Sequence, residues 1–273
     1  MDRVLRYYHN LIKNEYRQLR SEIQPIEYAL WWILRIGMII GVIRIYQKEP
    51  FIFFLTVLGN VAMTFSVAIV RFIFPKIFFI GRLPFAIQRY INISVLAGSF
   101  FGHIIPLYNR VQNYDKFLHV IAGFTGVFIG YHLMMCMKHN NKMVSPFVAS
   151  FSGFGFSCFL IVGWEIFEFF SDFYIQGSNN QDYNWQPSET MFFFKIFGQG
   201  VQNMGQTALY DTMIDMIIGL IGAIIGGIFI WPYVKKEILK NRKRGIKSPD
   251  ALRWEKVSVR ERQNKGIKIG TAK

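Results

Sequence analysis

Three apolar stretches of this sequence each carry two ionisable side chains about one helical turn apart. Residues three or four positions apart lie on one face of a helix, so each stretch presents a polar edge. Carboxylates and an imidazole on facing helices can bind a metal, relay protons or serve acid–base catalysis. The pairs are Asp115 and His119, Glu165 and Glu168, and Asp211 and Asp215, and Lys116 lies beside the first.

The composition around these residues is that of a membrane protein. The chain has 273 residues, of which 52% are hydrophobic and 17% aromatic, yet its formal net charge is +14. This combination fits neither a soluble globular domain nor a disordered chain. Several apolar stretches approach the roughly 20 residues that a helix needs to cross about 30 Å of hydrocarbon. The predicted fold class is all-α, a polytopic transmembrane helical bundle.

The apolar stretches predict about six spans. Their boundaries are residues 27–46, 50–72, 89–108, 114–137, 145–170 and 208–231. Residues 74–87 contain Pro75, Gly81 and Pro84 and are predicted to form an interfacial turn. Residues 1–26 are predicted to form a basic amphipathic helix on the membrane. The membrane domain is therefore 27–231, and 232–273 is a basic tail, predicted to be disordered or peripherally bound from Lys235 onward.

The distribution of Lys and Arg predicts the orientation of these spans. Twenty-five of the 31 basic residues lie in the two terminal segments and in two of the loops, whereas the loop 171–207 contains only Lys195. Basic residues accumulate on the cytoplasmic side, so both termini are predicted to be cytoplasmic and the loop 171–207 external. The basic termini are expected to attract the anionic inner leaflet, and no nucleic acid partner is expected.

Other polar residues in the spans are predicted to have structural roles. Arg35 and Arg44 are expected to extend toward opposite membrane surfaces, and Asn60 to hydrogen-bond across helices. Gly and Ser in the fifth and sixth spans are expected to let helices approach closely. Cys136 and Cys158 fall inside spans and are expected to remain free and to pack as small apolar residues.

The predicted orientation places the ionisable pairs at matching depths. At about 1.5 Å per residue, His119, Glu165 and Asp215 lie on the order of 10 Å below the outer boundary. Their partners Asp115, Glu168 and Asp211 lie about one turn nearer the outside. We therefore predict that all these side chains meet in one layer, in which protons, Lys116 or a metal must compensate five carboxylates. His103 lies at a similar level and is a further candidate.

A divalent metal is the cofactor that such a layer would suit. Mg, Mn or Ca fits the carboxylates, and Zn or Fe also accepts an imidazole. The alternative is a network that only holds helices together, but interhelical polar bonds in membranes contribute about 0.6 kcal/mol each. No nucleotide or flavin motif is present. The candidate metal ligands are His119, Glu165, Glu168, Asp211 and Asp215.

Three ordered motifs carry a resemblance to a known family. They are Asn113-Tyr114-Asp115-Lys116-x-x-His119, Glu165-x-x-Glu168 and Asp211-Thr212-x-x-Asp215-Met216. Over about residues 102–227 the sequence resembles the bacterial membrane family typified by YjdF, whose function is unknown, and more distantly the VanZ-like family. One departure is Gln206-Thr207-Ala208, where the YjdF pattern has a Gly-Asp pair after the Gln. The resemblance implies a multi-pass protein of the bacterial cytoplasmic membrane.

The sequence leaves three functions open. The first is an outward-opening, metal-dependent enzyme acting on a lipid-linked envelope molecule, with Lys116 binding an anionic substrate. The second is an ion- or proton-coupled carrier, although no internal repeat supports it. The third is a non-catalytic envelope scaffold. The loop 171–207, with Asp182, Trp185 and residues 192–194, is either an interfacial anchor or a lid over the layer.

Overall fold

The computed structural model describes residues 2–46, 51–74, 79–137, 144–174, 180–181 and 204–243. All regular structure in these ranges is helical, as predicted. The first half contains α1 (Asp2–Glu22), α2 (Pro25–Tyr46), α3 (Phe51–Met63), α4 (Ser66–Ile73), the 3₁₀ turn η1 (Ile80–Arg82), α5 (Phe85–Val95) and the π-helix η2 (Leu96–Ile104). The second half contains α6 (Leu107–Arg110), α7 (Tyr114–Met137), α8 (Pro146–Tyr174) and α10 (Met204–Lys243).

Four helices are long and apolar enough to cross a membrane. They lie within α2, α7, α8 and α10, and the bent pair of α3 and α4 would make a fifth span if it counts as one. The predicted span 89–108 corresponds to α5 followed without a break by η2, neither of which is long enough alone. The count of six spans therefore stays a prediction.

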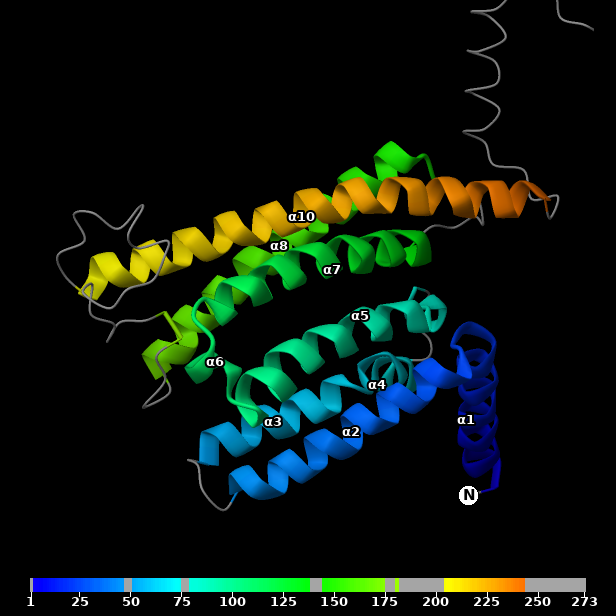
Figure 1. The fold of residues 1–273 in the computed structure, drawn as a ribbon. Coiled ribbons are helices and arrows are strands. Elements are labelled where there is room, and N and C mark those ends of the chain that lie inside the picture. The colour runs from blue at the N-terminus through cyan, green and yellow to red at the C-terminus, as the bar shows by residue number, and fades with distance from the viewer. Residues whose placement is uncertain are drawn as a thin grey trace, which may run out of the picture.

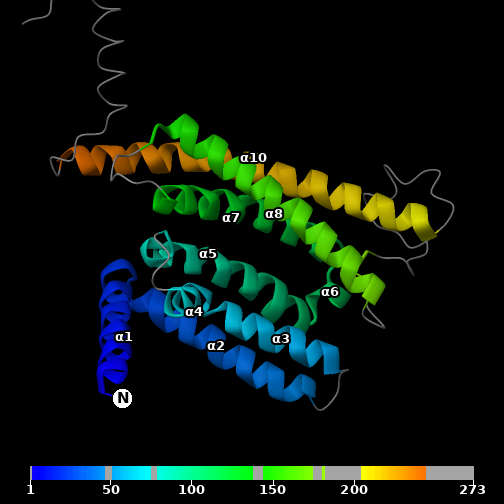
Figure 2. The same ribbon diagram turned by 180° about the vertical axis from the view of Figure 1, so that it is seen from behind.

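The helices form two groups that meet along α5 and α7 (Figure 1). One group is α7, α8 and α10, each in contact with the other two, and the other is α2, α3, α4 and α5. Tyr90 of α5 stacks on Phe128 of α7, with ring centroids 5.1 Å apart, and so joins the groups. The helix α1 crosses the end of the bundle at which α10 finishes (Figures 1 and 2).

Glycines bring the backbones of α7, α8 and α10 into direct contact. A β-carbon at Gly123 would clash with the carbonyl oxygen of Gly219, and one at Gly222 would clash with that of Val120. Between α7 and α8, Ser157 Oγ donates a hydrogen bond to the Gly123 carbonyl at 2.7 Å. Small residues of the fifth and sixth spans, α8 and α10, thus let both helices approach α7 closely, as predicted. These contacts fix the positions of the three helices along the bundle axis relative to one another.

The second predicted span is broken, contrary to the prediction of one helix over 50–72. The helices α3 and α4 meet at an angle of 74°. Gln88 of α5 spans the break, because its Nε2 donates to the Met63 carbonyl at 3.0 Å and its Oε1 accepts from the Val67 N–H at 3.0 Å. The backbone groups that the bend frees are thus satisfied by a side chain from another helix.

The sequence predicted that Arg35 extends to the membrane surface, and this prediction is wrong. Its side chain is buried, and its Nη2 donates to the carbonyl of Thr64 at 2.6 Å, at the same break. The guanidinium carbon also lies 3.9 Å from the ring centroid of Phe65. Asn92 Oδ1 accepts a hydrogen bond from Gln88 at 2.9 Å and so belongs to the same set. We call Arg35, Thr64, Gln88 and Asn92 the break cluster. The predicted cross-helix bond of Asn60 is confirmed, with Ser99 Oγ at 3.1 Å.

The two ends of the chain also differ from the predictions in detail. The helix α1 is docked on the bundle, since Glu15 pairs with Arg71 of α4 at 3.1 Å and Glu22 accepts from the Phe85 N–H at 2.7 Å. The interval predicted as an interfacial turn contributes buried Ile80, Leu83, Phe85 and Ile87 to the core beneath α1. The basic tail is helical as far as Lys243, so the prediction of disorder is wrong for residues 235–243, and residues 244–273 lie outside the described residues. Both cysteines are free, as predicted.

Candidate functional site

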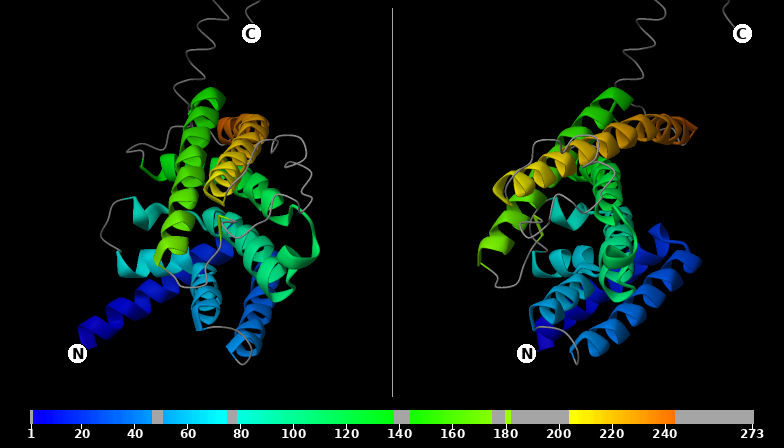
Figure 3. Two further views of the ribbon diagram at one scale, coloured as in Figure 1. Left: turned by 90° about the vertical axis from the view of Figure 1, so that its left-hand side faces the viewer. Right: turned by 60° about the vertical axis from the view of Figure 1, so that its left-hand side comes forward.

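The ionisable residues of the three motifs meet at one end of the α7, α8 and α10 group. Asp115, Lys116 and His119 lie in the first turns of α7, and Asp211 and Asp215 lie in the first half of α10. The two glutamates come from the last third of α8. This end of the bundle is opposite to α1 (Figure 1), and the left view of Figure 3 looks onto it. We call the set the acidic layer: Asp115, Lys116, His119, Glu165, Glu168, Asp211 and Asp215.

Lys116 neutralises one side of the acidic layer. Its Nζ lies 2.5 Å from Asp211 Oδ1 and 2.7 Å from a carboxylate oxygen of Asp215, and 3.5 Å from Asp115 Oδ2. All three members of the close contact are buried, and Asp215 is only 1% exposed. Of the compensating groups considered from the sequence, Lys116 therefore lies against both α10 carboxylates and offsets one of their two negative charges. An anionic substrate would have to compete with these contacts for the ammonium group.

His119 lies between the two sides of the layer. Its Nε2 is 3.6 Å from Asp115 Oδ2 and 3.7 Å from Asp215 Oδ2, and its Nδ1 is 3.7 Å from Glu165 Oε1. These separations exceed the roughly 3.2 Å limit of a direct hydrogen bond. The imidazole is thus surrounded by carboxylates that it does not bond directly.

Glu165 is the least satisfied group of the layer. The residue is 4% exposed, and among the described residues neither of its carboxylate oxygens makes a hydrogen bond of normal geometry, although the hydroxyl of Thr212 lies near enough to interact with the carboxylate. Glu168, one turn further along α8, accepts a hydrogen bond from the Trp164 indole at 2.7 Å. Buried polar atoms are nearly always paired, so an unpaired carboxylate indicates a missing ligand or proton.

Two overlapping groups in the layer have the geometry of metal ligands. His119, Glu165 and Glu168 each offer a donor atom, and these atoms lie within 4.8 Å of one another; the same holds for Asp115, His119 and Asp215. Two donors bound to one ion at about 2.0–2.2 Å lie roughly 3–4 Å apart. The 3.7 Å separation of His119 and Glu165, too long for a hydrogen bond, falls in that range.

A short piece of the following loop folds back over the layer. The carboxylate of Asp172 accepts hydrogen bonds from the N–H groups of Asn180 and Gln181, at 2.7 and 2.8 Å. Gln181 is buried, and its Nε2 donates to Thr212 Oγ1 at 2.9 Å, next to Asp211. Sequence reasoning did not select Gln181, and it named Thr212 only as part of the third motif, without a role. Asp182, Trp185, residues 192–194 and Lys195 lie outside the described residues.

His103, the further candidate, does not join the metal-ligand groups. It lies in the π-helix η2, with its ring centroid 4.9 Å from that of Tyr108. Tyr108 in turn contacts the ring of Tyr114, which begins α7. His103 thus contacts α7 through the ring of Tyr108.

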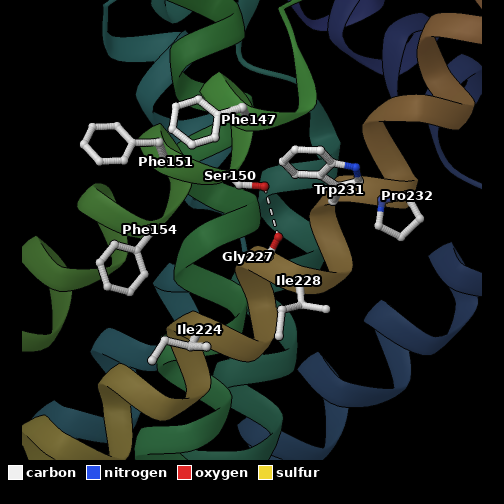
Figure 4. A pocket seen from close by; sticks show the side chains of 9 residues that line it. All are labelled: Phe147, Ser150, Phe151, Phe154, Ile224, Gly227, Ile228, Trp231 and Pro232. Carbon is white, nitrogen blue, oxygen red and sulfur yellow. Dashed lines mark hydrogen bonds between the residues drawn. The ribbon is translucent and has the colours of Figure 1, made fainter.

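The hollow on the surface of this helix group lies away from the acidic layer. It is a groove between the first half of α8 and the second half of α10 (Figure 4). Gly227 in the groove and Asp215 in the layer are 12 residues apart, or about 18 Å along α10. The groove and the layer are therefore separate features of the same helix pair.

Comparison with known proteins gives one match. A family model described as "Predicted membrane protein (DUF2238)" matches residues 26–236. No curated protein matches significantly, and no solved structure does. The matched range contains every residue of the acidic layer.

Proposed function

Since the chain belongs to the DUF2238 family of predicted membrane proteins, we propose that its acidic layer binds a divalent metal inside the membrane. Through that metal the protein acts on a lipid-linked molecule of the cell envelope. The observation that carries this proposal is Glu165, a buried carboxylate that has neither a hydrogen bond of normal geometry nor a Lys or Arg partner among the described residues, placed 3.7 Å from His119 Nδ1.

The charges of the layer support a bound cation. Its five carboxylates face a single ammonium group, and Lys116 is engaged with Asp211 and Asp215. The two glutamates of α8 have no comparable cation among the described residues, and burying them uncompensated would be costly. A divalent ion on His119, Glu165 and Glu168 would balance them. The imidazole favours zinc or iron over magnesium or calcium.

The position of the layer indicates what the metal could reach. Asp115 is the most open member, with 39% of its side chain exposed, at the end of the bundle opposite α1. A metal beside it would polarise a phosphate or carbonyl oxygen entering from that end, and His119 or a free carboxylate would accept a proton. A lipid, or a molecule attached to a lipid, can enter such a site directly from the membrane.

The setting that we propose is the bacterial cytoplasmic membrane with both termini in the cytoplasm. The end of α10 lies on the same side of the bundle as α1, in keeping with this arrangement (Figures 1 and 2). The exposed Lys13, Arg17 and Arg20 of α1 would face the anionic inner leaflet. The YjdF-like resemblance is compatible with the family found, and the VanZ-like relationship stays a prediction.

A second candidate is an ion- or proton-coupled carrier. The observation in its favour is the broken span of α3 and α4, since broken helices line the binding sites of many carriers. Here, however, the break is bridged by Gln88 and Arg35 and belongs to the other helix group. The acidic layer itself is built from three continuous helices. A non-catalytic scaffold has no evident use for these charges.

Elemental analysis of the protein purified in detergent at near-neutral pH tests the metal. We expect about one equivalent of zinc or iron in the wild type and loss of it in His119→Ala and Glu165→Gln. Glu237→Gln is the matched control, because it makes the same change in α10 about 33 Å along the helix from Asp215. A wild type without metal, after supply of both ions during expression, would refute the metal site. Proton-linked uptake into liposomes that disappears in Asp215→Asn would favour the carrier instead.

A further inference from the structure

The groove between α8 and α10 is lined almost entirely by apolar and aromatic side chains. Its volume is about 520 Å³, within the range of small-molecule sites. Phe147, Phe151 and Phe154 line it from α8, and Ile228 and Trp231 from α10 (Figure 4). The exposed fractions of Phe151 and Ile228 are 70% and 64%. The groove thus opens away from the protein, along segments apolar enough to span a membrane.

The groove offers no free polar group to a ligand along its walls. Ser150, its single hydroxyl, donates to the carbonyl of Gly227 at 3.0 Å and is thereby occupied (Figure 4). At Gly227 the helix surface is open, because a β-carbon there would have no heavy atom within 4 Å. A hydrocarbon chain fits such a surface, and a polar group does not.

Positive charge lies at one end of the groove. Trp231 forms part of the wall, and Lys235 Nζ, one turn further along α10, lies 5.9 Å from the centroid of its ring. Lys236 is next to it, and both lysines are exposed. Basic side chains beside a groove between membrane helices favour anionic head groups, with Trp at the level of the interface.

We propose that the groove binds one acyl chain of an anionic phospholipid whose phosphate is held by Lys235 and Lys236. The argument is one of complementarity along the molecule. Hydrocarbon meets the walls between Phe147 and Trp231, and the negative head group meets the lysines where α10 leaves the apolar region. This site is independent of the acidic layer and of any metal.

Photo-crosslinking in nanodiscs tests this site. One of two probes with identical diazirine-bearing acyl chains is included, either phosphatidylglycerol or phosphatidylcholine, and labelled peptides are mapped by mass spectrometry. We expect peptides that contain 147–154 and 224–231 to be labelled more by phosphatidylglycerol, by roughly fivefold for each lysine engaged. The double variant Lys235→Gln and Lys236→Gln should label equally with both probes.

Two glycine variants separate the groove from the general lipid surface. Gly227→Leu places a side chain in the groove, where its β-carbon has no heavy atom within 4 Å, and we expect it to abolish the labelling of both peptides. Gly163→Leu makes the same change on the exposed surface of α8, where a β-carbon likewise meets nothing within 4 Å, and should preserve it. Equal labelling of the wild type by both probes would mean only annular lipid and would overturn the proposal. Since both lysines are exposed, the double variant decides even if Gly227→Leu fails to fold.

Discussion

The break cluster and the acidic layer are two polar sets buried to a similar degree in the same bundle. Gln88 is 2% exposed and Glu165 is 4% exposed. The amide of Gln88 uses both of its ends, bonding the Met63 carbonyl and Asn92 on one side and the Val67 N–H and Ser66 on the other. Glu165 has no such bonds among the described residues. The hydrogen bonds of the break cluster are nearly all made within the protein, whereas those of the acidic layer are not.

This difference separates a structural role from a functional one. A buried network whose members satisfy one another stabilises one conformation, here the bend between α3 and α4. A buried network with unpaired charges destabilises the fold unless something else binds. The comparison therefore predicts opposite effects of mutation at Gln88 and at Glu165.

Removal of Lys116 should have the largest effect. In Lys116→Met the carboxylates of Asp211 and Asp215 lose the cation that lies 2.5 and 2.7 Å from them. Breaking a buried ion pair from one side typically costs about 3–5 kcal/mol. We expect a loss of that size in the free energy of unfolding, measured by SDS titration in mixed micelles. Adding Asp211→Asn and Asp215→Asn should recover most of it, and no recovery would show that Lys116 acts through packing.

The pairing of Lys116 shows which features the sequence could predict. The helices and the common depth of the three polar edges follow from local rules, namely the helical repeat and the rise per residue. Depth counting therefore brought His119 close to Glu165 and Asp215, as the structure does. The counting could not assign partners within the layer, because these depend on how each helix rotates about its axis.

The bend between α3 and α4 was not predictable from its own sequence. No Gly or Pro occurs between Val61 and Ser66 to mark it. The bend depends on Gln88 and Arg35, two polar residues from other helices, so the sequence of residues 50–72 carries no signal for it. Likewise α10 continues past Trp231 because a helix need not end where its apolar composition does.

Gln88→Leu should have the next largest effect. It leaves the Met63 carbonyl and the Val67 N–H buried without their partner, at a cost of about 2–3 kcal/mol. Asn60→Leu is the control, because that amide donates one hydrogen bond to the hydroxyl of Ser99 among the described residues and its loss should cost about 0.6 kcal/mol. The same SDS titration measures both. Equal losses would mean that Gln88 is an ordinary interhelical contact and does not hold the bend.

Glu165→Gln should have the opposite sign. In the presence of a chelator the variant lacks a buried unpaired charge while keeping the shape of the side chain, so we expect it to be more stable than the wild type by about 1 kcal/mol. With metal added, the wild type should gain stability by binding, and the variant should not. Glu237→Gln should match the wild type in both conditions. Destabilisation by Glu165→Gln without metal would place Glu165 with the structural residues of the break cluster.

Mutation of Glu15 should have the smallest effect of the four. Its carboxylate is partly buried, with 21% of the side chain exposed, and it is paired with one cation. Burial raises its pKa above 4.5, and Glu22 adds to the rise, while the ion pair with Arg71 opposes it. A raised pKa means that the docked state of α1 binds the proton more tightly, so docking should be strongest below pH 4.5 and weaken as the pH rises through the raised value.

Amide hydrogen exchange of α1, corrected for intrinsic rates, measures this docking at about pH 7 and about pH 5. We expect greater protection at the lower pH and no such difference in Glu15→Gln. Docking that weakens on acidification would mean that Arg71 outweighs burial. A single ion pair would then suffice to hold a carboxylate in its charged form in this protein. Because Glu165 has no Lys or Arg partner among the described residues, that result would point still more directly to a bound cation at Glu165.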